Sequence, residues 1–126
     1  MQRIDIEKTR CSPQICMDGD GGVIDLKGES YPENVTAFYA PLFEWLRGYL
    51  AVADNTQLTV NIELLYFNSS SSKLLMDLID LLDDASLAGK RVVVNWRYDA
   101  DNDMAEEYGE EFAEEVAHLT FNLVTL

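Results

Sequence analysis

The chain has 126 residues, of which 48% are hydrophobic, and this length and composition suit one domain with its own core. Nine Lys and Arg residues stand against 23 Asp and Glu residues, for a formal net charge of −14. Because this charge repels phosphate backbones and anionic lipid, we expect neither a nucleic acid nor a membrane surface as partner. The sequence shows no long apolar span and no signal-peptide pattern, so we expect a cytoplasmic protein.

The beginning of the chain predicts a β-hairpin. Residues 14–18 and 23–29 flank the turn Gly-Asp-Gly-Gly, and glycine tolerates the positive φ that such turns require. The first ten residues either add a short strand or lie along the surface. The sequence alone leaves both arrangements open.

The two cysteines do not form a recognisable metal motif. Cys11 and Cys16 lie near the N-terminus, and the single histidine, His118, lies near the other end. A structural zinc site takes about four Cys or His ligands, so this set does not predict one. We expect two free thiols, no metal and no cofactor.

A helical pattern follows the segment Tyr31-Pro32-Glu33-Asn34. Between Val35 and Leu50 the apolar residues recur at intervals of three and four positions, as in an amphipathic helix. Asn34 is a credible N-cap for this helix. Pro41 interrupts the pattern, so the helix either kinks there or begins near it, where proline fits the first turn.

The middle of the chain predicts a strand followed by a helix. Residues 58–67 alternate like a half-buried strand, which places Tyr66 on the side of Leu58 and Phe67 on the opposite side. From Ser70 to about residue 87 the leucines form one helix face and the aspartates follow the other. Gly89 is a plausible stop for this helix.

The last third repeats this arrangement. Residues 91–98 alternate as a strand, an apolar stripe from Met104 to Val116 indicates a third helix, and residues 119–126 close the chain as a strand. The third helix has three candidate caps: Asp99, Asp101 and Asp103.

The predicted order, ββαβαβαβ, favours an α/β fold with a largely parallel, twisted sheet of about five strands and right-handed crossovers. A parallel sheet covered on both faces has continuously apolar strands. The central strands here instead carry polar residues on one face, for example Asn61, Glu63 and Asn95. We therefore expect the helices mainly on the other face, with the polar face open to water or to a partner.

The stretch YFNSSSSK, residues 66–73, places four consecutive serines at the carboxyl edge of this sheet, where sites of α/β proteins tend to form. Catalysis is not favoured, because no glycine flanks the serines as in a nucleophile elbow and His118 precedes the last strand, towards the opposite edge. The glycines of a phosphate-binding P-loop are missing as well. The sequence therefore offers no catalytic residues.

Two interpretations of the serines remain open from their chemistry. Asn68 or one of the serines caps the following helix, and the stretch is then a cap or polar turn. One cap needs only one residue, however, and a spare exposed serine at a helix start suits a phosphate, whose charge the free N–H groups and the helix dipole favour.

Three stretches, GESYPEN (28–34), LLYFNSSSSKLLMDLIDLL (64–82) and VVVNWRYD (92–99), resemble the SiaC family of bacterial regulatory phosphoproteins. The resemblance covers nearly the whole chain. It implies a single STAS-like domain over residues 1–126, similar to anti-sigma-factor antagonists, and a regulatory rather than an enzymatic role.

The resemblance also implies partner switching. A SiaB-like protein kinase phosphorylates one hydroxyl, a SiaA-like phosphatase of the PP2C type removes the phosphate, and the unmodified form binds a SiaD-like diguanylate cyclase that affects cyclic-di-GMP and biofilm formation. The family's acceptor is a threonine, and the matching position here is Ser69, so this chain departs from the family at that residue. A constitutive interaction domain with no phosphorylation switch is the alternative.

The contact surface implied by the resemblance surrounds Ser69. Lys73, the only basic residue in or beside the serine run, either holds the phosphate or pairs with a carboxylate of the partner. The expected partner-binding residues are Tyr31, Pro32, Glu33, Asn34, Tyr66, Asn68, Ser70 and Lys73.

Overall fold

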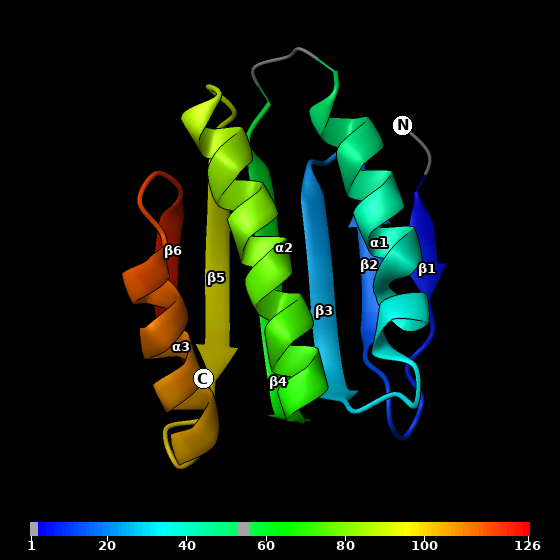
Figure 1. The fold of residues 1–126 in the computed structure, drawn as a ribbon, viewed down its shortest axis with the longest axis vertical. Helices are drawn as coiled ribbons and strands as arrows, with labels where there is room; N and C mark the ends of the chain where they lie inside the picture. Colours follow the sequence, from blue (N-terminus) through cyan, green and yellow to red (C-terminus); the bar gives the residue numbers. More distant parts are fainter. Residues whose placement is uncertain (1–2, 53–55) are drawn as a thin grey trace.

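The computed structural model describes residues 3–52 and 56–126, and in this part of the chain it shows six strands and three helices (Figure 1). The elements in chain order are β1 (Ile4–Ile6), β2 (Gln14–Asp18), β3 (Val23–Ser30), α1 (Val35–Leu50), β4 (Leu58–Phe67), α2 (Ser69–Leu87), β5 (Val92–Tyr98), α3 (Asp103–Glu115) and β6 (Thr120–Thr125). The predicted order is confirmed. The first residues add a short strand, β1, to the sheet.

All strands belong to one sheet, and their order in space is their order in the chain, β1 to β6. The first three strands pair antiparallel, and β3 to β6 pair parallel. Each parallel crossover moves one place in the same direction, so right-handed connections put every helix on the same face. Figure 1 shows α1, α2 and α3 in front of the sheet, which confirms the expected one-sided layer of helices.

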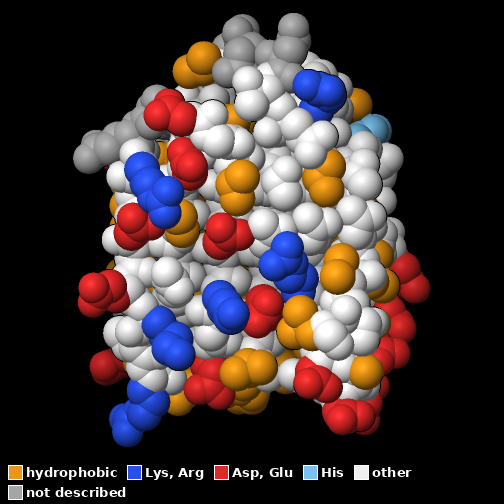
Figure 2. All heavy atoms as spheres, turned by 180° about the vertical axis from the view of Figure 1, so that it is seen from behind, with side chains coloured by type: hydrophobic (Ala, Val, Ile, Leu, Met, Phe, Trp, Pro, Cys, Tyr) orange, Lys and Arg blue, Asp and Glu red, His pale blue; other side chains and the backbone are white. Residues whose placement is uncertain are grey.

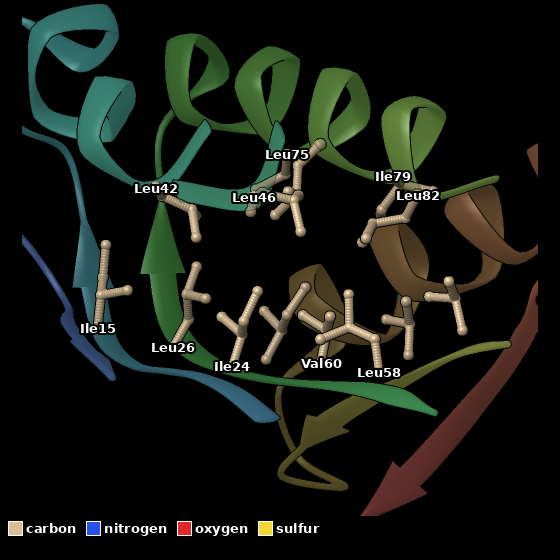
Figure 3. Packing of buried hydrophobic residues seen from close by; sticks show 14 of the residues in the cluster. Ile15, Ile24, Leu26, Leu42, Leu46, Leu58, Val60, Leu75, Ile79 and Leu82 are labelled. Carbon is tan, nitrogen blue, oxygen red and sulfur yellow. The ribbon is translucent and has the colours of Figure 1, made fainter. Parts of the chain in front are cut away.

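The core lies between this helical layer and the sheet (Figure 3). Alternate residues of the strands point towards the helices, whose apolar stripes face them. Burying each such side chain contributes roughly 1.5–3 kcal/mol, so this layer holds the helices on the sheet. The residues that meet include Ile15, Ile24, Leu26, Leu58 and Val60 from the strands, and Leu42, Leu46, Leu75, Ile79 and Leu82 from the helices.

The opposite face of the sheet carries a row of hydrogen-bonded polar side chains. The Asn61 amide donates to Asp25 Oδ1 at 2.8 Å, and the Asn95 amide donates to Asn61 Oδ1 at 2.9 Å. Asn122 extends the row to β6 by donating to Asn95 Oδ1 at 3.0 Å. The amides of Asn61 and Asn95 each donate to one neighbouring strand and accept from the other, and the row ends at the carboxylate of Asp25. Figure 2 shows this face, where Lys and Arg side chains lie among acidic ones.

α1 begins at Val35 and continues through Pro41. Asn34 is its N-cap, since its Oδ1 accepts the Ala37 N–H at 3.1 Å. Of the two possibilities for Pro41, a helix start there is therefore wrong. The proline removes one helical N–H, and the carbonyl four residues earlier, that of Ala37, loses its usual donor.

The cap of α3 differs from the prediction. Asn102, rather than an aspartate, is the N-cap and accepts the Ala105 N–H at 3.1 Å. Asp99 instead closes the preceding turn by accepting the Asp101 N–H at 2.9 Å, and Asp103 is already the first helical residue. The amide of Asn102 also donates to the carbonyl of Leu65 at 2.9 Å, a contact that an aspartate could not make because an ionised carboxylate has no donor.

Asp83 of α2 fixes the loop between α3 and β6. Its carboxylate accepts the N–H groups of Ala117, His118 and Leu119, the last two at 2.8 and 2.9 Å. Burial alone would raise the pKa of Asp83, but these backbone hydrogen bonds outweigh burial and hold the pKa below its ordinary value. The charged carboxylate therefore stabilises the entry into β6.

Candidate functional site at the carboxyl edge of the sheet

A single residue, Asn68, separates the end of β4 from the start of α2. Its Oδ1 accepts the Ser71 N–H at 2.9 Å. Its own N–H donates to the carbonyl of Ser30 at 3.2 Å, which ties the start of α2 to the end of β3. The helix is therefore capped by Asn68 and starts at Ser69, one residue earlier than predicted. No serine side chain is needed as the cap.

The four serines have different surroundings. Ser69 and Ser70 are exposed. Ser71 is fully buried, and its hydroxyl lies 2.9 Å from that of Ser30. Ser72 is half-buried and donates its hydroxyl to the Ser69 carbonyl at 2.7 Å. Only the first two serines therefore present their side chains openly to an enzyme or a partner.

A buried chain of hydroxyls lies beneath these exposed serines. The Ser30 hydroxyl is within hydrogen-bond distance of Ser71, and it lies 2.6 Å from the hydroxyl of Tyr39 in α1. Burial raises the pKa of Tyr39 to about 12, against the smaller opposing effect of the Ser30 hydrogen bond. Tyr39 thus stays protonated at neutral pH, and the chain joins α1, β3 and α2 under the site.

Tyr66 reaches the surface because β4 is irregular near its end. Gly28 of β3 pairs with Leu64, but the next residue, Glu29, pairs with Tyr66, so Leu65 is an extra residue in β4. Such a bulge reverses the side on which the following residues point. The predicted sides of Tyr66 and Phe67 are therefore wrong: Tyr66 is 46% exposed and Phe67 is buried in the core.

The bulge leaves two large side chains, Leu65 and Tyr66, exposed near the end of β4. Leu65 is 60% exposed, one of the largest values for an apolar side chain in the described part of the chain. The ring of Tyr66 meets that of Tyr31 edge to face, with 5.8 Å between the centroids. Tyr31 is held by its N–H, which donates to the Cys11 carbonyl at 2.7 Å. The structure thus brings Tyr31, Tyr66 and the start of α2 to one edge.

The remaining predicted site residues lie on two sides of this edge. Pro32, Glu33 and Asn34 belong to the loop between β3 and α1, where Asn34 caps α1. Lys73 is exposed and lies one turn after Ser69, on the side of α2 that faces α3. Lys73 is therefore near the serines but not part of the Tyr31–Asn34 loop surface.

The groove that Lys73 lines, between α2 and α3, has a volume of about 530 Å³ and an acidic rim. Asp80 lies in it together with Glu111, Glu114 and Glu115. Burial, and then repulsion from neighbouring carboxylates, raises the pKa of Asp80 above its ordinary value. Lys73 is thus the basic group of an otherwise acidic groove.

Sequence reasoning missed several residues of this site. It did not find Leu65, because nothing in Leu-Leu-Tyr-Phe marks a bulge. It also did not find Ser30 and Tyr39, because Ser71, the serine whose hydroxyl meets that of Ser30, looks like its neighbours, and Tyr39 joins the site through Ser30. His118 lies in the loop before β6, at the opposite edge from Ser69. Within residues 3–52 and 56–126, no three His, Cys, Asp or Glu side chains are arranged to hold a metal ion.

The fold and the two exposed hydroxyls at the start of α2 define an α/β domain with one sheet, one helical layer and an accessible helix start at its carboxyl edge. The chain belongs to the SiaC family: the model for the SiaC family regulatory phosphoprotein matches residues 6–126. The resemblance seen in the sequence is thereby confirmed. In the described ranges, none of the helices has the length and apolar character needed to cross a membrane.

Known proteins similar to this chain include two solved structures. SiaC of Pseudomonas aeruginosa matches with a TM-score of 0.91 and 32% identity, and all of both chains is covered. A crystal structure of diguanylate cyclase SiaD in complex with its activator SiaC, from the same organism, matches with a TM-score of 0.90 and 33% identity, over 98% of this chain and 99% of that one. An uncharacterised P. aeruginosa protein is 36% identical over 115 residues, 91% of this chain and 90% of its own length.

Proposed function

We propose that this protein is a phosphorylation-controlled regulator that acts through binding rather than catalysis. In its unmodified form it binds and activates a diguanylate cyclase, and it is released when Ser69 is phosphorylated. A SiaB-like kinase adds the phosphate and a SiaA-like phosphatase of the PP2C type removes it, so the cell adjusts cyclic-di-GMP and biofilm formation. Membership of the SiaC family and the complex of the similar SiaC with the cyclase SiaD support this role.

The observation that carries the choice of Ser69 is the difference between the serines. A kinase needs a free hydroxyl, and Ser69 and Ser70 are the two exposed members of the run. Ser71 is enclosed in the core and Ser72 uses its hydroxyl on a carbonyl. Ser69 is also the residue that directly follows the Asn68 cap, the position that corresponds to the family's threonine.

A phosphate at Ser69 suits the helix start. The first N–H groups of a helix have no helical acceptor, and the helix dipole favours negative charge there. The phosphate adds a charge of about −2, and Lys73, one turn later, is placed to approach it. Phosphorylation thus leaves α2 folded and changes the surface that a partner meets.

Release of the cyclase follows from what lies next to Ser69. The rings of Tyr31 and Tyr66 meet close to the start of α2, and a partner that covers them must also remove water from that helix start. A doubly charged phosphate loses far more hydration free energy in such an interface than a hydroxyl does. The phosphate also competes for Lys73 with any carboxylate of the partner.

The test combines mass and binding measurements. Incubation with a SiaB-like kinase and ATP should add one phosphate to the intact protein, and to Ser70→Ala, but not to Ser69→Ala. Ser69→Ala should bind a SiaD-like cyclase as the unmodified protein does. Ser69→Asp should bind at least about tenfold more weakly, which corresponds to roughly 1.4 kcal/mol.

Two results would count against the proposal. Phosphate that still appears on Ser69→Ala would remove the assignment of the acceptor, and Ser70→Ala would then show whether the neighbour takes its place. Equal binding of Ser69→Ala and Ser69→Asp would favour the alternative, a constitutive interaction domain in which the serines only form a polar helix start.

A further inference from the structure

The two edges of the sheet differ in how they are protected from pairing with another chain. β1 has only three residues, Ile4–Ile6, and charged residues stand within it and on both sides. Short, charged edge strands are a usual defence against unwanted strand pairing. β6 has six residues, Thr120–Thr125, and residues 119–126 contain no charge, proline or glycine. The second edge therefore lacks the defences of the first.

The side chains of β6 are open as well. At the left edge of the sheet in Figure 1, β6 pairs with β5, and within the described residues no strand lies beyond it. Three of the large apolar side chains that the structure leaves exposed are in or next to this strand: Leu123 (40%), Val124 (36%) and Leu126 (61%). An uncovered apolar edge of this length favours addition of a further strand.

The hydrogen-bond pattern shows which backbone groups are available. The Leu126 N–H donates to the Tyr98 carbonyl of β5 at 2.9 Å. Because N–H groups of a strand alternate in direction, those at positions 120, 122 and 124 also point to β5. The N–H groups of Phe121, Leu123 and Thr125 consequently point away from the sheet, where they can meet another strand.

We propose that a second copy of this chain docks on β6, antiparallel to it, so that one sheet continues through a two-fold dimer. A two-fold axis through Leu123 places Leu123 opposite Leu123 of the second copy, and Phe121 opposite Thr125 of the second copy. This register pairs all the outward N–H groups, and it is self-complementary, as a two-fold interface must be. The two exposed leucines then cover each other.

Charge opposes this dimer but does not prevent it. α3, with seven acidic residues from Asp103 to Glu115, packs on β4, β5 and β6, so its middle lies over β5. In the dimer, three strand intervals lie between the two β5 strands: β5 to β6, β6 to the second copy's β6, and that β6 to its own β5. With a strand spacing of about 4.8 Å, the two α3 helices are therefore about 14 Å apart. The Debye length is about 8 Å at physiological salt, so the repulsion is largely screened there and is much stronger at low salt. β6 itself brings no charge to the interface.

The test measures the oligomeric state of the full chain by sedimentation equilibrium at low and at physiological salt. The expected result is a monomer–dimer equilibrium whose association constant increases as salt is added. Leu123→Asp places two carboxylates at the axis and should weaken dimerisation by at least about tenfold. Leu87→Asp makes the same substitution at an exposed leucine in α2 and should dimerise like the unmodified chain.

A second variant keeps the proposal testable if Leu123→Asp fails to fold. Thr125→Pro removes one outward N–H and leaves the pairing with β5, and proline is tolerated on edge strands at such positions. It should also weaken dimerisation while its far-UV circular dichroism stays unchanged. A chain that remains monomeric at every salt concentration, a dimer that both β6 variants leave intact, or an association that weakens as salt increases would each overturn the proposal. None of these outcomes depends on phosphorylation of Ser69.

Discussion

Gly109 offers a strong test of how tightly α3 packs on the sheet. It lies inside α3 and is buried, and a Cβ atom at this position would lie 2.6 Å from Trp96 Cδ1 and 2.7 Å from both Trp96 Nε1 and Leu123 Cδ2. Ordinary contacts between carbon atoms are about 3.5–4.0 Å. The substitution Gly109→Ala therefore requires a shift of roughly one ångström in the indole ring, in α3 or in both.

Two effects of opposite sign decide the result. Alanine has a higher helix propensity than glycine, by about 1 kcal/mol. Against this gain, the Trp96 ring cannot yield easily, because its Nε1–H donates to the Ala105 carbonyl at 2.9 Å and its faces and edges pack against Phe67 and Phe112. Overpacking costs about 1–3 kcal/mol, and breaking the indole hydrogen bond would cost a further 1–3 kcal/mol or so. We expect a net destabilisation of about 1–5 kcal/mol, with the upper part of this range reached if the indole hydrogen bond breaks.

The assay is urea unfolding followed by tryptophan fluorescence, with Gly48→Ala as the matched control. Gly48 is an exposed glycine inside α1, so there the propensity gain should prevail and stability should increase by up to about 1 kcal/mol. The two variants should thus shift the unfolding midpoint in opposite directions at similar slopes. An equal or higher midpoint for Gly109→Ala than for the unmodified chain would refute the packing argument.

Three further outcomes follow from the described contacts. Asp83→Asn should destabilise the fold by about 1–3 kcal/mol at neutral pH. Because the pKa of Asp83 is lower in the folded than in the unfolded protein, this difference in stability should shrink as the pH falls below about 4 and approaches the folded-state pKa. Unfolding curves at several pH values measure this change. Tyr39→Phe removes one end of the buried hydroxyl chain and should cost about 1 kcal/mol in chemical denaturation without altering Ser69 phosphorylation. Asn95→Leu interrupts the amide row on the open face and should cost about 0.5–1.5 kcal/mol, whereas Asn95→Gln should restore little of it because the longer side chain misses the register.

The regular elements could be predicted because their periodicities are strong. The apolar repeat before and after Pro41 is continuous, and two of the three helices start at an asparagine cap, Asn34 or Asn68, that the sequence already suggested. The cap of α3 was missed because four polar residues in the segment DADND have similar capping propensities, and only the contact from Asn102 to Leu65 separates them.

The site itself was only partly predictable. Alternation assigns sides only when polar and apolar residues differ, and the run Leu-Leu-Tyr-Phe at the end of β4 is apolar throughout. The bulge at Leu65 depends on the partner strand, so no local signal reveals it. In the same way the burial of Ser71 depends on Ser30, which lies far away in the sequence.

The order of the strands affects how the chain can be assembled during synthesis. Since every strand pairs with the strand before it in the sequence, each new strand leaving the ribosome finds its complete template already made. Pairing never has to wait for a distant segment, which keeps loop closure short and folding fast for a parallel sheet. The sheet can thus grow one strand at a time from β2 and β3, and β6 is the last to be added.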